Sequence, residues 1–170
     1  MELIVIVAVA ENGVIGNKNA IPWSIKEDFQ HFQDLTKNNT CVMGDRTYDS
    51  LPENARPLPN RENIILTFNK DYKAPGTKIF FSWDDALRYC KENDRKKVFF
   101  CGGASIYKLG LQYADTFELT RIHRNYEGDT KFPDIDFSQW ELIKQEDKEG
   151  KDRNTNEIVK FSFLTYKRKR

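Results

Sequence analysis

Long apolar segments and an excess of charge of either sign are both missing from this sequence of 170 residues. No apolar run approaches the roughly 20 residues that a transmembrane helix needs, and the first residues lack the features of a secretory signal. The 27 Lys and Arg residues nearly balance the 26 Asp and Glu residues, so the formal net charge is +1 and no basic surface for nucleic acid is expected. We therefore expect a cytoplasmic protein that binds neither nucleic acid nor membranes.

Cysteine and histidine are also scarce. Cys41, Cys90 and Cys101 are odd in number and far apart, unlike the cysteines of a disulfide framework or a zinc site. His31 and His123 have no serine, cysteine or metal-ligand partner at a useful spacing. The sequence therefore indicates neither a bound metal nor nucleophilic catalysis.

The residues that are present predict one α/β domain over residues 1–166. Residues 3–10 form a continuous apolar run, which is typical of a strand covered on both faces. Further strands are expected at residues 40–43, 63–67, 77–81, 98–101, 115–122, 140–145 and 158–166. Because helical segments separate most of them, we expect a mostly parallel, mixed central sheet flanked by helices, with an antiparallel C-terminal edge. Residues 147–157 are expected to form a polar loop, and residues 167–170 a solvated basic tail.

Local signals mark where the helices begin. Ser24 and Glu27 have the spacing of a capping box, and Ser82 is expected to cap a helix over residues 83–93. Shorter helices are expected at residues 47–51 and from 104 to about 109. A loop rich in Gly and Asn, residues 12–19, separates the first strand from the first helix.

Asp28 is the first residue that could carry chemistry. Its spacing from Ile25, Phe29, Phe32 and Leu35 places a carboxylate on the apolar face of a helix. A buried acid needs a specific partner, because burying an isolated charge is costly. Asp28 is therefore either a structural acid with an internal partner or an acid that holds a polar ligand and supports proton transfer. The residues alone leave both interpretations open.

Two glycine-containing junctions between a strand and a helix form the second feature. Gly102-Gly103 and Gly44 each follow an expected strand and precede an expected helix. Free backbone N–H groups and the helix dipole favour an anion at such junctions, and Arg46 could reach a phosphate while Thr47 caps the helix. The pair suggests a dinucleotide lying across the carboxyl ends of the strands, and the alternative is two ordinary turns.

Arg61 is the third candidate. It follows the segment Pro57-Leu58-Pro59-Asn60 and precedes an expected strand. Its guanidinium could bind a ligand carboxylate through two hydrogen bonds, and an ordinary surface arginine is the alternative.

Six segments together resemble the dihydrofolate reductase family in their order and spacing. They are Val14–Trp23, the pair Asp28 and Phe32, Met43-Gly44 with Thr47-Tyr48, Arg56–Arg61, Cys101–Tyr107 and Glu127–Pro133. The resemblance runs from about residue 3 to residue 163. It implies an NADP-dependent oxidoreductase that reduces 7,8-dihydrofolate to 5,6,7,8-tetrahydrofolate, with hydride transfer to pterin C6 and proton addition at N5. Such a reaction supports one-carbon metabolism and thymidylate synthesis.

The resemblance also implies a role for individual residues. Asp28 would be the catalytic acid, pairing with the 2-amino group and N3 of the pterin. The implied substrate-binding residues are Ile6, Ala8, Asp28, Phe32, Leu51, Arg56, Leu58, Arg61, Cys101 and Thr120. The implied NADPH-binding residues are Ala8, Ile15, Gly16, Asn19, Ala20, Gly44, Arg46, Thr47, Thr67 and the run Gly102, Gly103, Ala104, Ser105, Ile106 and Tyr107. Residues 16–23 would form a mobile lid, braced by Asp129.

The sequence departs from the family pattern on the cofactor side. Asp45 stands where many relatives have a basic residue near the adenosine 2′-phosphate, and Phe68 replaces a residue that is usually polar or basic. Arg46, Thr67 and Lys70 remain as candidates to recognise the phosphate. We therefore expect NADPH to be used, with an unusually small preference over NADH.

Two other functions are weighed beside this one. The pyrimidine reductase of riboflavin synthesis would share the fold and the cofactor, but Asp28 and Arg61 favour a pterin with a glutamate tail. A non-catalytic nucleotide-binding module would not need an acid on the pterin side. We expect a monomer that acts on a small molecule.

Overall fold

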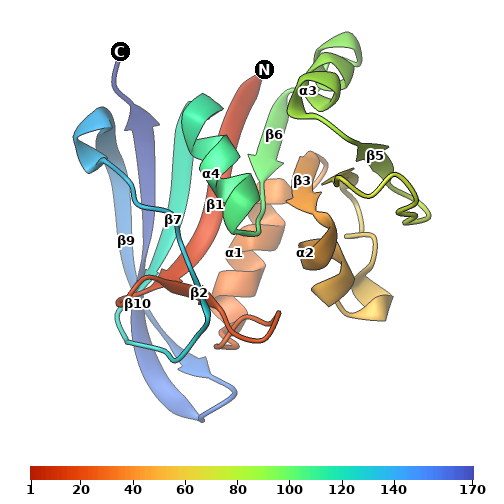
Figure 1. The fold of residues 1–170 in the computed structure, drawn as a ribbon. Coiled ribbons are helices and arrows are strands. Elements are labelled where there is room, and N and C mark those ends of the chain that lie inside the picture. The colour runs from red at the N-terminus through yellow and green to blue at the C-terminus, as the bar shows by residue number, and fades with distance from the viewer.

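An eight-stranded sheet runs through the computed structural model, which describes residues 1–170 (Figure 1). The strand order is β5-β4-β3-β6-β1-β7-β10-β9. The strands are β1 Glu2–Ala10, β3 Thr40–Gly44, β4 Glu62–Leu66, β5 Lys78–Phe80, β6 Lys97–Phe100, β7 Thr116–Ile122, β9 Trp140–Asp152 and β10 Glu157–Arg168. The six strands from β5 to β7 are parallel, and β10 and β9 add the antiparallel edge. The predicted fold class is confirmed.

Helices cover both faces of this sheet, and each face has its own hydrophobic cluster. The helices are α1 Lys26–Thr36, α2 Asp45–Ser50, α3 Trp83–Glu92 and α4 Ala104–Tyr113, with 3-10 turns η1 Glu53–Ala55 and η2 Phe137–Gln139. Val5 and Val7 of β1 enter the cluster that contains residues of α3 and α4, whereas Ile4 and Ile6 enter the cluster packed against α1 and α2. Because side chains alternate across a strand and both faces of β1 are covered, its residues from Leu3 to Ala10 are all apolar.

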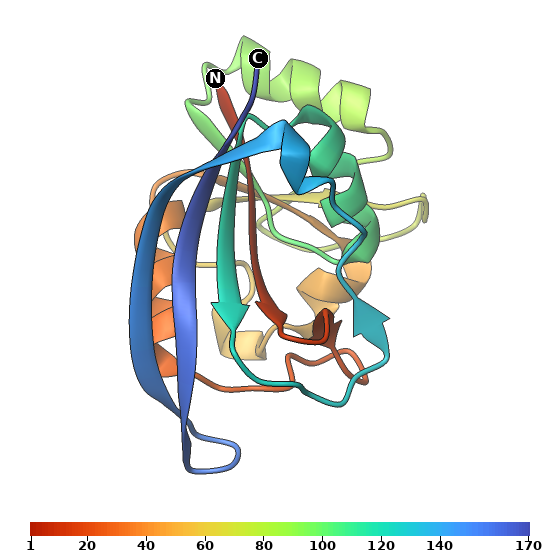
Figure 2. The same ribbon diagram turned by 90° about the vertical axis from the view of Figure 1, so that its left-hand side faces the viewer.

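The two long antiparallel strands differ most from the prediction. The expected polar loop at residues 147–157 is mostly strand, because β9 continues to Asp152 and β10 begins at Glu157. Figure 2 shows this blue hairpin projecting beyond the rest of the sheet. Cross-strand bonds such as Ser162 Oγ to Asp147 Oδ1, at 2.7 Å, stabilise charged strands that face water. The low hydropathy of these residues therefore led to the wrong prediction of a loop.

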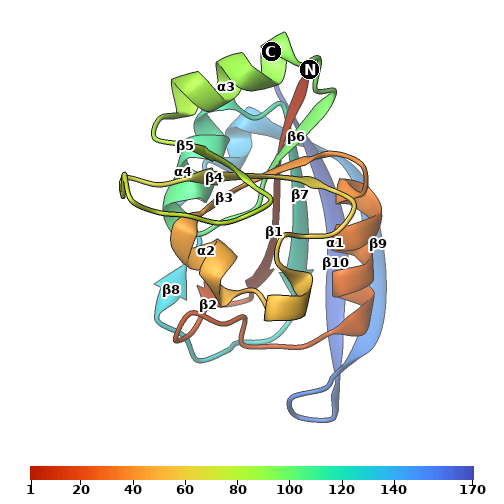
Figure 3. The same ribbon diagram turned by 90° about the vertical axis from the view of Figure 1, so that its right-hand side faces the viewer.

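The expected basic tail is shorter than residues 167–170. β10 includes Lys167 and Arg168, and the Arg168 Nε–H donates to the carbonyl of Ala114 at 2.8 Å. Arg170 forms an ion pair with Asp115. Figure 3 shows both chain termini beside α3, at the end of the sheet where the parallel strands begin.

Two of the predicted helix signals have different outcomes. Ser82 caps α3 as expected, accepting a hydrogen bond from the Asp85 N–H at 3.2 Å. The capping box at Ser24 is wrong, because α1 starts at Lys26 and the Ser24 hydroxyl instead accepts from Arg153 Nε at 3.1 Å. The Ser24 hydroxyl therefore bonds to a residue that is distant in the sequence and does not cap α1.

α4 also extends beyond the expected end near residue 109. Gly110 lies inside it, where a Cβ would come within 2.7 Å of the Phe100 ring and 2.9 Å of Val5. This glycine allows the helix to approach β1 and β6 closely and does not end it. None of the helices combines the length and apolarity that crossing a membrane would require.

Candidate active site

The sheet opens between β1 and β6 at its carboxyl edge. Pairing of β1 with β6 ends at Val5 and Phe100, whereas pairing of β1 with β7 continues to Ala10. Ligands of parallel sheets bind outside the carboxyl ends of the strands, where neighbouring strands diverge. Ile6 and Cys101, two of the predicted substrate-binding residues, follow directly on the two sides of this opening.

Several apolar residues that were predicted to bind the substrate meet at this opening. Ile6 and Leu58 belong to one hydrophobic cluster, and Phe32, Leu51 and Cys101 pack against it. The loop that carries Leu58 is held by Asn63, whose side chain accepts from the Leu58 N–H at 2.9 Å and donates to its carbonyl at 3.1 Å. Five of the predicted substrate residues are therefore neighbours of one cluster.

Asp28 lies in the first turn of α1 and is half-buried. Desolvation raises its pKa to about 6, and the neighbouring Thr120 hydroxyl opposes that rise. No cationic side chain contributes to the pKa of this carboxyl. Thr120 is 3% exposed and lies beside Ala8 in the pairing of β7 with β1. A desolvated acid with one neutral partner matches an acid held for a ligand better than a paired structural acid.

Arg61 is held against the end of α1. Its Nε–H donates to the Pro59 carbonyl at 2.9 Å, and Nη1 donates to the Thr36 hydroxyl at 3.2 Å. The guanidinium carbon lies 5.8 Å from the centre of the Phe32 ring. These contacts orient a cation beside the apolar wall, where it could bind a carboxylate.

Arg56 points to a different partner. Its Nη1–H donates to the Asp49 carbonyl of α2 at 3.1 Å, and Nη2 lies 3.9 Å from the Glu53 carboxylate. A substrate role for Arg56 stays a prediction.

The two glycine junctions lie next to each other at the same edge. The Gly44 N–H donates to the Gly102 carbonyl at 2.9 Å, and a Cβ on Gly103 would lie 3.4 Å from Thr47 Oγ1. No side chain caps α4, so its first N–H groups remain available to an anion. Thr47 is not a cap, because α2 begins at Asp45 and Gly44 is its N-cap residue.

The run after Gly103 divides between surface and core. Ser105 is exposed and Ala104 is half-buried, whereas Ile106 and Tyr107 are buried in the cluster of α3 and α4. Burial raises the pKa of Tyr107, with Cys101 and Asp28 adding to the rise.

The expected lid has a defined geometry. β2, Val14–Gly16, pairs with β8, Thr130–Lys131, and residues 17–20 close a tight turn in which Lys18 and Asn19 have φ of 50° and 62°. The Asp129 carboxylate accepts from the Lys18 N–H at 3.0 Å, and the Asp129 N–H donates to the Gly16 carbonyl at 3.1 Å. Ile15, Gly16, Asn19 and Ala20 thus lie on one braced segment.

The remaining cofactor residues lie at the ends of β3 and β4. Thr67 is buried directly after β4, and Arg46 is exposed in the first turn of α2. The Thr67 hydroxyl donates to the Asp45 carboxylate at 2.8 Å.

Trp23 is the residue that the sequence reasoning left out of the site. Its indole ring packs on Tyr126, with ring centres 5.0 Å apart, and its Nε1–H is buried without a partner. A buried donor without a partner is costly, so a ligand group that accepts from it would be stabilising. Its position at the end of the expected lid was the available signal.

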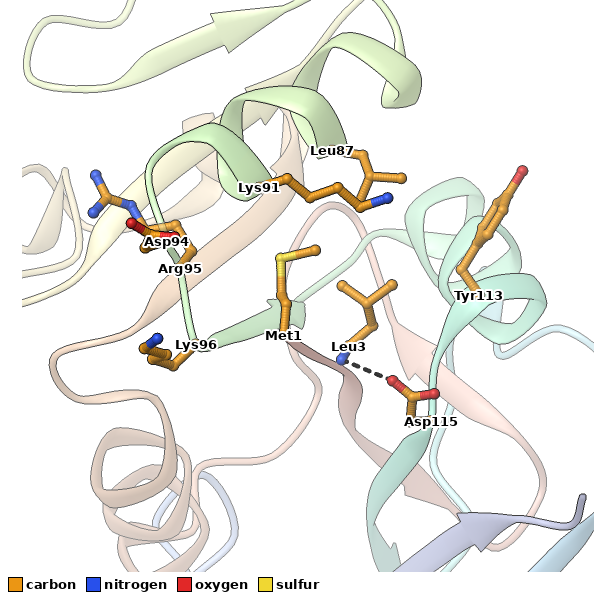
Figure 4. Close-up of a pocket in the computed structure, with 9 residues that line it drawn as sticks. All are labelled: Met1, Leu3, Leu87, Lys91, Asp94, Arg95, Lys96, Tyr113 and Asp115. Carbon is orange, nitrogen blue, oxygen red and sulfur yellow. Dashed lines mark hydrogen bonds between the residues drawn. The ribbon is translucent and has the colours of Figure 1, made fainter.

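A separate cavity lies at the opposite edge of the sheet. Its volume is about 480 Å³, and the Leu3 N–H donates to the Asp115 carboxylate at its edge at 3.2 Å. Figure 4 shows the residues that line it, among them Met1, Lys91 and Tyr113. It contains none of the predicted site residues. We therefore place the candidate active site at the carboxyl edge of the sheet, where the predicted residues lie, and not in this cavity.

Known proteins that are similar to this chain belong to one family. The family model described as dihydrofolate reductase matches residues 2–168. The chain is 34% identical to the dihydrofolate reductase of Bacillus subtilis (strain 168) over 164 residues, which cover 96% of this chain and 93% of that protein. It is 34% identical to dihydrofolate reductase type 3 of Salmonella typhimurium over the full length of both. A solved structure of dihydrofolate reductase from Enterococcus faecalis complexed with NADP(H) and RAB-propyl superposes with a TM-score of 0.86, at 34% identity, and covers 99% of this chain and 97% of that one.

Proposed function

The chain belongs to the dihydrofolate reductase family, and from that premise we propose what each part of its carboxyl edge does. The chain reduces 7,8-dihydrofolate to tetrahydrofolate with NADPH. The observation that carries the assignment of roles is the Asp28 carboxylate, which is desolvated beside Thr120 at the opening between β1 and β6. The pyrimidine reductase and the non-catalytic module are not favoured by this family assignment.

Asp28 binds and orients the pterin in this proposal. Its carboxylate accepts hydrogen bonds from the 2-amino group and N3, while Thr120 holds it in position. Because burial raises the pKa of Asp28 to about 6, the carboxyl exchanges a proton close to neutral pH and supports proton addition at N5. Ile6, Leu58 and Phe32 keep water from the ring and strengthen these hydrogen bonds.

The tail of the substrate extends toward Arg61. The three contacts of its guanidinium with Pro59, Thr36 and Phe32 hold it in one orientation. An arginine held in this way binds a carboxylate with little loss of side-chain entropy, so Arg61 binds the carboxylate of the glutamate tail.

The residues at the glycine junctions fit NADPH. The uncapped start of α4 and the close approach of Gly103 to Thr47 leave backbone N–H groups for its pyrophosphate. When bound, NADPH supplies the hydride that reaches C6 of the pterin. The segment braced by Asp129 closes over the nicotinamide and excludes water.

The test is dihydrofolate-dependent loss of NADPH absorbance by the parent chain and by Asp28→Asn. We expect kcat/KM to fall at least about 100-fold in this variant, because the carboxylate that orients the pterin and supports proton transfer is gone. Asp34→Asn is the matched control, since Asp34 is an exposed acid on the same helix. Equal activity of Asp28→Asn and the parent would overturn the role of Asp28.

We also propose that the chain acts as a monomer on small molecules alone. Light scattering of the purified protein checks this, and a mass of twice 20.0 kDa would contradict it.

A further inference from the structure

The expected path of the cofactor leads from Asp28 toward the ends of β3 and β4. The nicotinamide must reach the opening beside β1, and the pyrophosphate lies at the junctions after β6 and β3. In the strand order β4-β3-β6-β1, the adenosine therefore extends over the end of β4. Asp45 and Thr67 lie there, at the start of α2 and directly after β4. This placement rests on the proposed function.

The polar groups at this point are already committed to one another. Asp45 Oδ2 accepts from the Thr67 hydroxyl at 2.8 Å, and Asp45 Oδ1 accepts from the Arg46 N–H at 2.6 Å. The Thr67 oxygen in turn accepts from the Asn69 N–H at 3.1 Å. A phosphate that needed the Thr67 proton would have to displace a carboxylate from it.

The cations expected to bind a phosphate are few. The Lys70 ammonium lies 4.1 Å from the centre of the Phe81 ring, which engages it in a cation–π contact. Phe68 is 96% exposed and offers no hydrogen bond. Of the two predicted cations, Arg46 and Lys70, only Arg46 has no side-chain partner of this kind.

A second carboxylate makes this corner more negative. Asp49 lies one turn after Asp45 in α2 and accepts from the Tyr72 hydroxyl at 2.7 Å. Burial raises the pKa of Tyr72, and both carboxylates add to that rise. Two carboxylates of α2, Asp45 and Asp49, therefore lie at the corner where a 2′-phosphate would bind.

We propose that Asp45 reads the ribose of the cofactor and makes this reductase one that uses NADH about as well as NADPH. The Asp45 carboxylate accepts a hydrogen bond from the 2′-hydroxyl of NADH, as acids do in other dinucleotide sites, and repels the 2′-phosphate of NADPH. The chemistry of hydride transfer is the same with both, so the difference lies in cofactor binding.

The experiment compares kcat/KM for NADPH and NADH, with saturating dihydrofolate, in the parent, Asp45→Asn and Asp71→Asn. For the parent, we expect the two values to lie within about tenfold of each other, because the Asp45 carboxylate opposes the attraction of Arg46 for the phosphate. In Asp45→Asn we expect the ratio of NADPH to NADH to rise roughly tenfold or more, because a like charge is removed from the phosphate.

Asp71→Asn controls for net charge, since Asp71 is exposed in the same loop and makes no side-chain contact with Thr67. We expect its ratio to equal that of the parent. Fluorescence titration with each cofactor gives the same comparison as dissociation constants without turnover.

Each outcome decides the matter. A parent ratio above about 100-fold in favour of NADPH would overturn this inference and leave the proposed function intact. An equal rise in ratio for Asp71→Asn and Asp45→Asn would show net charge at work and overturn the role of Asp45. No dihydrofolate-dependent turnover with either cofactor, in folded protein, would overturn both proposals. The parent ratio needs no variant, so a failure of Asp45→Asn to fold does not prevent the test.

Discussion

Two pairs of aspartate and threonine lie at the two ends of the ligand path, and they differ in their surroundings. Asp28 faces Thr120 in an apolar opening, and no cation contributes to its pKa. Asp45 faces Thr67 at a helix start, where it also accepts from a backbone N–H. The same residue types therefore do different work. In our proposals, the Asp28 carboxylate is held for the pterin and a proton, whereas the Asp45 carboxylate selects between a hydroxyl and a phosphate.

Removing the hydroxyl of each threonine in turn tests this comparison with the largest expected effect. In Thr120→Val we expect kcat/KM for dihydrofolate to fall by about 10- to 100-fold with either cofactor, because Asp28 loses its one orienting partner. In Thr67→Val we expect less than about a twofold change in the same quantity at saturating cofactor, since the change lies at the far end. Steady-state kinetics with both cofactors checks the pair. Similar losses in the two variants would contradict the separation of roles.

Arg61 extends the comparison along the substrate. In Arg61→Ala we expect KM for dihydrofolate to rise about tenfold, because a charge-assisted contact with the tail is lost. The ratio of NADPH to NADH should not change. Arg61→Lys is the matched variant, which keeps the charge but loses the paired donors, so we expect it to recover only part of the affinity. An unchanged KM in Arg61→Ala would place the tail elsewhere.

The brace of the lid should give the smallest effect. Asp129→Ala removes the acceptor for the Lys18 N–H, so the segment over the nicotinamide loses a contact that holds it closed. We expect kcat to fall about two- to fivefold and KM for both cofactors to rise together. Glu127→Gln, an exposed change in the same loop, should leave both unchanged. A loss confined to one cofactor would argue against a role in closure.

Local patterns were sufficient to predict most of the parallel sheet, and the pterin side of the site stays a prediction. The apolar run of β1 and the glycine junctions are short-range signals, and the family motifs that include Asp28 and Arg61 lie on elements that those signals locate. The cap at Ser24 could not be predicted, because its competing partners Asp152 and Arg153 lie more than 120 residues away along the chain.

Other errors came from charge patterns. β9 has many charged residues facing water, and its strand character depends on pairing with β10. On the cofactor side, the sequence suggested that Lys70 could bind the phosphate. It did not predict that the Lys70 ammonium lies on the Phe81 ring, or that the Thr67 hydroxyl is committed to Asp45. These contacts join residues that are far apart in the sequence, so no local spacing specifies them.

The central claim is that Asp28 is held for a ligand at a cost to the folded protein. Its pKa of about 6 lies above the value of about 3.9 in the unfolded chain, so the folded state binds the proton more tightly. The unfavourable contribution is therefore absent below about pH 4, grows as the pH rises toward 6 and is complete above it. The difference in pKa corresponds to up to about 3 kcal/mol at neutral pH.

The most direct measurement is the free energy of unfolding of Asp28→Asn and the parent, without ligands, by denaturant titration at pH 7 and pH 5. We expect Asp28→Asn to be more stable at pH 7 by about 1–2 kcal/mol, since the asparagine amide is itself partly desolvated, and by less at pH 5. Asp45→Asn should instead be less stable by about 0.5 kcal/mol, because a charge at a helix start is lost. A loss of stability in Asp28→Asn at pH 7 would make Asp28 a structural acid and contradict the account.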